Sequence, residues 1–194
     1  MKRLFRVLRV IIVAAFLTWM VLSFTVRGFQ VGSGSMEPTL KKGDCVVLDR
    51  MTYHTREPMR GEVIAFRFDP NDPDNLTQGE NFVARAWDLM GEIAQVTHEG
   101  TEYYVKRVIG LPEDHVEIRN GIIFVNGIEL VEDYPVVRDY SNASFDVPER
   151  SVLVLGDNRM DSYDSRYWGY VPYDSIIGRA VARYWPLSRA GSIE

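Results

Sequence analysis

Residues 116–127 read Val-Glu-Ile-Arg-Asn-Gly-Ile-Ile-Phe-Val-Asn-Gly, and they carry the clearest structural signal in the chain. Residues 116–119 alternate between apolar and charged side chains, which is typical of a strand with one buried face. Asn120-Gly121 then supplies the residue pair that a two-residue hairpin turn prefers. A second apolar run at residues 122–125 ends in another Asn-Gly turn. The pattern predicts a β-meander and a β-rich protein.

Further strand patterns lie on both sides of this meander. Residues 45–48 and 62–66 are rich in β-branched and aromatic residues, and each run follows a turn that contains glycine. Residues 151–155 read Ser-Val-Leu-Val-Leu, which predicts a strand buried on both faces. Residues 176–184 form one more candidate strand. The spacing of these runs indicates a mainly β fold.

The strand pattern is interrupted twice. Residues 67–101 read as an insertion, in which a proline-rich loop at 69–74 precedes helical spacing of apolar residues at 81–95. Residues 138–150 are polar, and we expect them to connect a small subdomain back to the core. The predicted β core therefore comprises residues 28–111 and 151–190, with a small β-hairpin subdomain at 112–150.

The N-terminal segment predicts a membrane anchor. Residues 1–27 contain five basic residues and no acidic residue, and residues 10–26 carry no charge. As a helix this run would be about 26 Å long, slightly short of a bilayer's hydrocarbon core, and flanking arginines can snorkel to the interfaces. A cleaved signal peptide would share the basic start. However, the apolar run is too long for one, and no Ala-x-Ala site follows it.

The charge distribution predicts the orientation of this anchor. Four basic residues precede the apolar run and only Arg27 closely follows it, so the N-terminus should remain in the cytoplasm. The chain has a formal net charge of −5 despite its basic start, so the part after the anchor is acidic. An acidic domain is a poor match for nucleic acid, which we do not expect as a partner.

Cysteine and histidine offer little chemistry. Cys45 is the single cysteine of the sequence, so no intrachain disulfide can form. The acidic residues near His115 have no partner cluster with ligand spacing, and we expect neither a metal nor a cofactor.

Ser35 is the candidate nucleophile. It lies in residues 32–40, Gly-Ser-Gly-Ser-Met-Glu-Pro-Thr-Leu. Alone, Gly-Ser-Gly-Ser is typical of a flexible linker. Pro38 restricts the backbone, and the neighbouring glycines permit close approach. The stretch therefore indicates a rigid turn that displays one hydroxyl group.

Lys106 is the candidate base. It lies in residues 104–110, Tyr-Val-Lys-Arg-Val-Ile-Gly, a run in which both faces of a strand look buried. A lysine usually points to water, but one placed here would lose hydration, and desolvation lowers its pKa towards neutrality. A neutral lysine can take the proton of a serine hydroxyl.

A third motif follows the strand at 151–155. Residues 156–169 read Gly-Asp-Asn-Arg-Met-Asp-Ser-Tyr-Asp-Ser-Arg-Tyr-Trp-Gly. The density of Asp, Arg, Ser and Trp exceeds what a solvated loop requires, and it predicts an ordered hydrogen-bonded network.

Together, residues 29–40, Gly43-Asp44, residues 104–112 and residues 156–169 resemble the sequence boxes of bacterial type I signal peptidases, in order and behind an anchor of matching orientation. The resemblance implies a transmembrane helix, a β-rich catalytic domain and a smaller β appendage. Glu113 departs from the family pattern, where a glycine is common, which puts the local turn geometry in doubt.

The resemblance also implies residue roles. Ser35 would be the nucleophile of a Ser-Lys dyad and Lys106 its general base, while Ser162 would hydrogen-bond and orient the lysine. Ser33 and the Ser35 N–H would stabilise the oxyanion, and Asp164 with Arg166 would form a supporting ion pair. Asp157 and Arg159 would help to hold the loop. The apolar residues Phe29, Val31, Met36, Leu40 and Val105 would line the substrate subsites.

By the same resemblance, the substrates would be signal peptides of exported preproteins, cleaved after small residues in an Ala-x-Ala pattern. The enzyme would be a single-pass protein of the plasma (inner) membrane with its catalytic domain on the outer face, in contact with lipid and near the secretion machinery. Two alternatives stay open: a related Ser-Lys protease that matures a dedicated substrate, and an inert, membrane-tethered domain that binds peptides.

Overall fold

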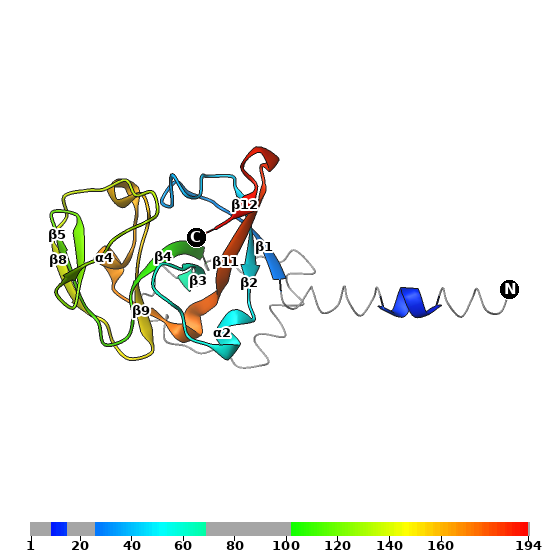
Figure 1. The fold of residues 1–194 in the computed structure, drawn as a ribbon, viewed down its shortest axis with the longest axis horizontal. Helices are drawn as coiled ribbons and strands as arrows, with labels where there is room; N and C mark the ends of the chain where they lie inside the picture. Colours follow the sequence, from blue (N-terminus) through cyan, green and yellow to red (C-terminus); the bar gives the residue numbers. More distant parts are fainter. Residues whose placement is uncertain (1–8, 15–25, 69–101, 194) are drawn as a thin grey trace.

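The protein is described by a computed structural model in which residues 9–14, 26–68 and 102–193 are placed. Within these segments the chain is mainly β, as the sequence predicts (Figure 1). The strands are β1 (Val26–Gln30), β2 (Cys45–Asp49), β3 (Val63–Phe68), β4 (Glu102–Gly110), β5 (His115–Arg119), β6 (Ile122–Val125), β7 (Ile128–Glu129), β8 (Ala143–Asp146), β9 (Ser151–Leu155), β10 (Val171–Pro172), β11 (Ile176–Trp185) and β12 (Gly191–Ser192). The helical turns are α2 (Thr52–Thr55), α4 (Ser165–Trp168), η2 (Arg159–Asp161), η3 (Tyr173–Ser175) and η4 (Leu187–Arg189).

The larger sheet positions the candidate site. Its strand order is β1-β2-β11-β3-β4-β9-β10, with β12 paired to β11, and all pairings are antiparallel. Strand β4, which carries Lys106, lies between β3 and β9. Edge strand β1 leads directly into the turn that carries Ser35. Ser35 and Lys106, which are 71 residues apart in the sequence, are therefore positioned by the same sheet.

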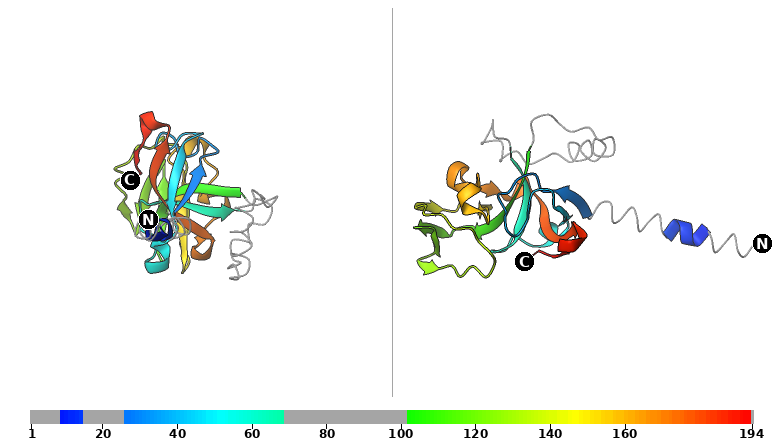
Figure 2. Two further views of the ribbon diagram at one scale, coloured as in Figure 1. Left: turned by 90° about the vertical axis from the view of Figure 1, so that its right-hand side faces the viewer. Right: turned by 90° about the horizontal axis from the view of Figure 1, so that it is seen from above.

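The smaller sheet has the order β7-β6-β5-β8 and lies at the end of the β body remote from β1 (Figures 1 and 2). Asn120 and Gly121 have φ angles of 49° and 78°, and Asn126 and Gly127 have φ angles of 52° and 81°. These left-handed pairs are what two-residue hairpin turns require, so the predicted β-meander is confirmed.

The connection from residue 138 to residue 150 contains more structure than we expect from its polarity. Ala143–Asp146 form strand β8, which pairs with β5 in antiparallel register. Exposed and half-buried residues alternate along β8, which is the pattern of an edge strand that covers only one face.

The two sheets share apolar packing. One cluster combines Ile109 of β4 and Leu153 and Leu155 of β9 with Val116, Ile118, Ile123 and Val125 of the smaller sheet. A second cluster lies beneath the Ser35 turn and includes Met36, Leu40, Leu48 and Val105. The five residues of β9 are all buried, as the sequence predicts.

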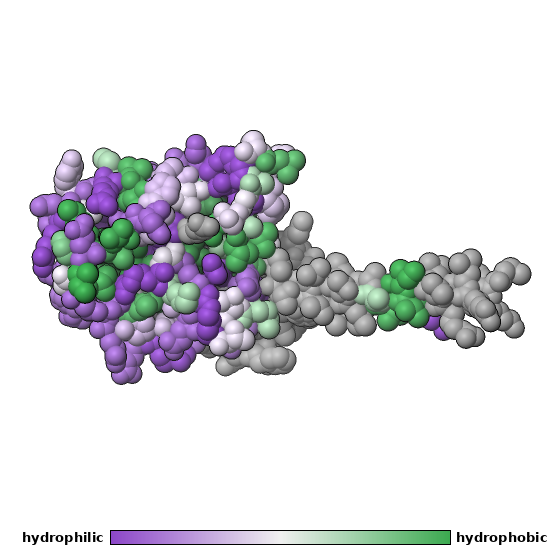
Figure 3. Space-filling model, viewed as in Figure 1, coloured by the Kyte–Doolittle hydropathy of each residue, from purple (hydrophilic) through white to green (hydrophobic). Residues whose placement is uncertain are grey.

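Two predictions fall largely or wholly outside the described residues. The predicted anchor runs from residue 10 to residue 26, of which residues 10–14 and 26 are described. Residues 9–14 are helical, and the side chains at 10–13 present an exposed apolar surface (Figure 3). Among the described helices, none has both the length and the hydropathy needed to cross a bilayer. The predicted loop at 69–74 and helix at 81–95 are not described at all.

Candidate active site

Ser35 sits on a turn that is fixed from both ends. At its base, the Val31 N–H donates to the Asp44 carbonyl over 2.8 Å, and the Gly43 N–H donates to the Val31 carbonyl over 2.8 Å. Met36 and Leu40 are 1% and 0% exposed, so they hold the turn against the core. These two buried side chains after Ser35, and the backbone hydrogen bonds of Val31 before it, leave little freedom to the hydroxyl.

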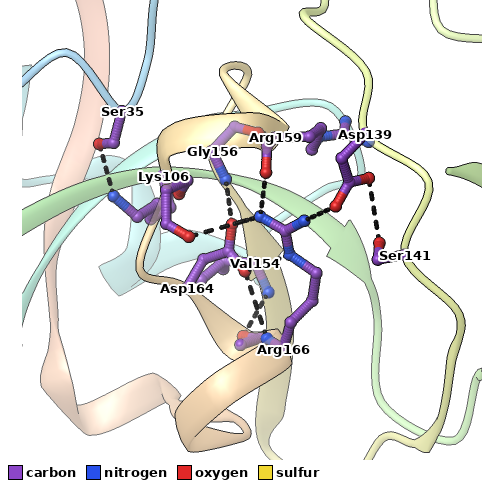
Figure 4. A network of polar contacts seen from close by, with 11 residues as sticks. Ser35, Lys106, Asp139, Ser141, Val154, Gly156, Arg159, Asp164 and Arg166 are labelled. Atoms are coloured by element: carbon purple, nitrogen blue, oxygen red, sulfur yellow. Dashed lines mark hydrogen bonds and ion pairs between the residues drawn. The ribbon is translucent and has the colours of Figure 1, made fainter.

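Lys106 reaches this hydroxyl from β4. Its Nζ lies 2.6 Å from Ser35 Oγ, and the two side chains meet head to head (Figure 4). The lysine is 2% exposed, because β3 and β9 flank its strand and the Tyr104 ring lies 5.4 Å from Nζ. The apolar run around Lys106 therefore places an amine in a site nearly closed to water.

Burial lowers the pKa of Lys106 from its ordinary 10.5 to about 8. Desolvation is the largest cause, because the charged ammonium loses its hydration. The carboxylates of Asp164 and Asp157 raise the pKa, and the guanidinium of Arg166 lowers it. About a tenth of Lys106 is therefore neutral at pH 7, far more than of an ordinary lysine, and this neutral form can accept a proton from Ser35.

Ser33 joins the pair from the same turn. Its Oγ lies 3.2 Å from Ser35 Oγ, and its side chain is exposed at the open side of the site. A hydroxyl in this place could donate to an oxygen bound next to Ser35, as an oxyanion donor would.

Ser162 lies close to the pair without hydrogen-bonding to it. Its Oγ is buried, and it has no hydrogen-bond partner among the described residues, so the predicted bond to Lys106 is not formed in this structure. Gly156 explains how the segments fit together. A Cβ at this glycine would lie 2.2 Å from Ser162 Oγ and 2.4 Å from the Ser35 carbonyl oxygen. Only glycine permits this approach.

Asp164 and Arg166 form the ion pair that the sequence predicts. Arg166 Nε lies 2.8 Å from Asp164 Oδ1, and the carboxylate is fully buried. Asp164 also accepts a hydrogen bond of 3.0 Å from the Gly156 N–H, and it caps α4 by accepting from the Arg166 N–H. This carboxylate therefore fixes the start of the loop at 156–166 against its end.

The partner of Asp157 is Arg107, which we do not predict as a site residue. Arg107 donates from Nε and from a terminal nitrogen to the two carboxylate oxygens over 2.9 and 2.8 Å, and both side chains are 0% exposed. Asp157 also accepts a hydrogen bond of 2.6 Å from the Thr39 hydroxyl. Arg107 could have been identified from the sequence, because it is a second charged residue, directly after Lys106, in a run whose other residues are mostly apolar.

A cavity of about 280 Å³ opens beside the pair. Four of the five predicted subsite residues line it, together with the two dyad candidates and Ser33; Tyr103 and Tyr104 are lining residues that we do not predict. Leu40 is not among the lining residues, because it is buried in the core beneath the turn. The lining from the predicted set is Phe29, Val31, Met36 and Val105.

In the described segments, no three His, Cys, Asp or Glu side chains lie close enough to hold a metal ion. The polar contacts at the site are the hydrogen bond between Lys106 and Ser35 and the ion pairs of Arg107 with Asp157 and of Arg166 with Asp164. The chemistry available there is nucleophilic attack by a hydroxyl whose proton goes to an amine.

Comparison with known proteins places the chain in a family. Residues 4–185 match the family described as "Signal peptidase, peptidase S26". A probable signal peptidase I-2 from Synechocystis sp. is 37% identical over 172 residues, which cover 87% of this chain and 67% of that protein. A signal peptidase I from Leptolyngbya laminosa is 37% identical over 88% of this chain and 74% of its own length. Thylakoidal processing peptidase 1 of Arabidopsis thaliana is 34% identical over 82% of this chain and 42% of its own. The chain belongs to the signal peptidase family, peptidase S26.

Proposed function

We propose that this serine endopeptidase removes signal peptides from preproteins with Ser35 as its nucleophile and Lys106 as its base. The observation that carries the assignment is the 2.6 Å contact between Lys106 Nζ and Ser35 Oγ in a site where the lysine is 2% exposed. A buried amine beside a hydroxyl at the rim of a cavity has the geometry of an activated nucleophile.

The reaction proceeds in two halves. Neutral Lys106 takes the Ser35 proton as the oxygen attacks the scissile carbonyl, and the Ser35 N–H and the Ser33 hydroxyl stabilise the oxyanion. The lysine then protonates the departing amine, which leaves an acyl-enzyme on Ser35. In the second half, Lys106 deprotonates a water that attacks the ester. The lysine then returns this proton to the leaving Ser35 oxygen, and the signal peptide is released with a new carboxylate.

The lining of the cavity supports cleavage after small residues. Val31, Met36 and Val105 present apolar surface to the cavity next to Ser35, which suits apolar side chains such as alanine. In the proposed subsites, side chains larger than alanine would be rejected by collision with this lining. An extended substrate can pair with strand edges near the site, which fits an Ala-x-Ala recognition sequence.

The N-terminal sequence supports a location at the membrane. Residues 1–27 would form a cytoplasmic basic flank and one transmembrane anchor, with the catalytic domain on the outer face of the plasma membrane. There the site would meet lipid-embedded signal peptides as they emerge from the secretion machinery.

One relative favours a second candidate within the same chemistry. The similarity to a thylakoidal processing peptidase raises the alternative of a processing protease with a dedicated substrate. A panel of unrelated preproteins separates the two, because a general signal peptidase would cleave several of them and a dedicated enzyme would cleave one.

The direct test uses the full chain purified in detergent and a preprotein with an Ala-x-Ala site. Ser35→Ala and Lys106→Ala should each abolish cleavage while the protein stays folded. The exposed residues Ser144 and Lys42 provide matched controls, and Ser144→Ala and Lys42→Ala should cleave at the normal rate. Undiminished cleavage by either dyad variant refutes the assignment.

A further inference from the structure

The segment between β7 and β8 runs along the loop at 156–166. We call residues 132–139 the strap. Val137 forms a parallel bridge with Asn158: its N–H donates to the Asp157 carbonyl over 2.9 Å, and its carbonyl accepts from the Arg159 N–H over 2.8 Å. The loop itself touches the nucleophile, because the Asn158 N–H donates to the Ser35 carbonyl over 3.1 Å.

At its start, the strap meets two buried arginines. Glu132 forms an ion pair with Arg159, and these side chains are 1% and 2% exposed. Glu132 also accepts a hydrogen bond of 2.9 Å from the Tyr134 hydroxyl, and the Tyr134 ring centre lies 3.8 Å from the guanidinium carbon of Arg107. Arg107 directly follows Lys106 in β4, so these contacts end one residue from the candidate base.

At its end, the strap meets a third arginine. Asp139 lies 2.6 Å from Arg166, which also pairs with Asp164 (Figure 4). The Arg166 side chain is 6% exposed, and its guanidinium is held between the two carboxylates. Asp139 thus helps Asp164 to hold the charge of Arg166, and that charge is one of those that act on Lys106.

The contact from the strap to Ser35 is short. Arg159 Nε donates to the Gly156 carbonyl over 2.8 Å, and the Gly156 backbone packs so closely against Ser35 that a Cβ would lie 2.4 Å from its carbonyl oxygen. Movement of Arg159 would therefore move backbone in contact with the nucleophile. Because interiors are close-packed, such a shift cannot be absorbed locally.

The smaller sheet holds the strap in place. The Gly121 N–H of the β5–β6 turn donates to the Ser141 carbonyl over 3.0 Å. A Cβ at Gly121 would lie 2.0 Å from the Asp139 carbonyl oxygen, so the turn lies directly against the strap. The smaller sheet therefore supports the strap, although none of its residues lines the cavity.

We propose that the strap positions Ser35 and Lys106 for the reaction, with Glu132 and Asp139 acting through Arg159 and Arg166. The inference rests on the roles proposed above for Ser35 and Lys106. None of residues 132–139 lines the cavity, so the strap should affect the chemical step and not substrate binding. Misplacement of reacting groups by a fraction of an ångström is sufficient to lower kcat markedly.

The test compares three near-isosteric variants of the full chain in detergent: Asp139→Asn, Glu132→Gln and the control Asp133→Asn, which changes an exposed carboxylate of the same strap. A signal-peptide substrate gives kcat and KM, and thermal denaturation gives stability. NMR titration of the Lys106 ε-carbon, which does not depend on catalysis, gives a further readout. Lys106 is faced by Asp157, Asp164 and Arg166.

We expect Asp139→Asn to lower kcat about tenfold with KM changed less than twofold. The Lys106 titration midpoint should move down, because Arg166 loses a compensating negative charge. Glu132→Gln should have a larger effect on kcat, and Asp133→Asn should match the parent enzyme.

Glu132→Gln leaves a buried arginine unpaired and can prevent folding, so Asp139→Asn decides the outcome. Folded Asp139→Asn with normal kcat and an unchanged Lys106 midpoint overturns the proposal, as does a variant that loses only thermal stability or changes only KM. If the parent chain fails to cleave, or Ser35→Ala cleaves equally well, the proposed function falls. In that case the catalytic role of the strap falls with it, whereas a shifted Lys106 midpoint in Asp139→Asn would still show that the strap acts on the lysine.

Discussion

Replacing Lys106 by methionine should stabilise the fold while it removes activity. The amine is buried and its pKa lies at about 8 instead of 10.5, so the folded state holds the charged form at a cost. The difference corresponds to roughly 3 kcal/mol at pH 7, because each pKa unit is worth about 1.4 kcal/mol. Methionine has a similar length and needs no hydration, so it should fill the same space.

The gain should depend on pH in a defined direction. The folded-state pKa lies below the unfolded value, so the cost is fully present below pH 8 and disappears as pH rises from about 8 to 10.5. Lys106→Met should therefore gain roughly 3 kcal/mol at pH 7 and only roughly 1 kcal/mol at pH 9.5.

Urea denaturation of the full chain at the two pH values measures both gains. Comparing each variant with the parent chain at the same pH cancels the contribution of other titrating groups. Lys41→Met, at an exposed lysine, is the matched control and should show little change with pH. A destabilised Lys106→Met, or a gain that does not vary between the two pH values, would refute the reasoning about desolvation.

Two further predictions concern the site. Below about pH 7, kcat/KM should fall about tenfold for each pH unit as Lys106 becomes protonated, and it should level off above pH 8; a flat profile from about pH 6 to 9 would contradict a lysine base. Gly156→Ala should lower kcat by about 100-fold or more in a cleavage assay, because its Cβ would lie 2.4 Å from the Ser35 carbonyl oxygen. Normal turnover by that variant would show that the packing of Gly156 against Ser35 does not matter for catalysis.

Local sequence chemistry accounts for the parts of the fold that could be predicted. The Asn-Gly turns at 120–121 and 126–127 need left-handed φ angles that these residues tolerate, so the meander follows from four residues. The apolar run at 151–155 is sufficient to predict a buried strand. Strand β8 could not be predicted in this way, because its polar residues form a strand only when β5 is beside them.

The candidate site likewise contains residues that local sequence identifies and residues that only the fold brings together. Ser35 and Lys106 are recognisable because each lies in an unusual local context, a rigid glycine-flanked turn and an apolar strand. The Asp164–Arg166 pair is also recognisable, because its members are two residues apart. The contacts of Arg107 with Asp157 and of Arg166 with Asp139 are not, because they join residues far apart in the sequence. Leu40 follows the serine closely, but the turn directs it into the core, which sequence proximity alone cannot reveal.

The most direct measurement is the titration of the lysine itself. Lys2, Lys41, Lys42 and Lys106 are the lysines of the sequence, so ε-carbon labelling gives a simple NMR spectrum, and Lys106→Met identifies the signal of interest. The structure predicts that this signal titrates at about pH 8. A Lys106 signal that titrates at about pH 10 or above, as an ordinary hydrated lysine does, would contradict a neutral amine as the base that activates Ser35.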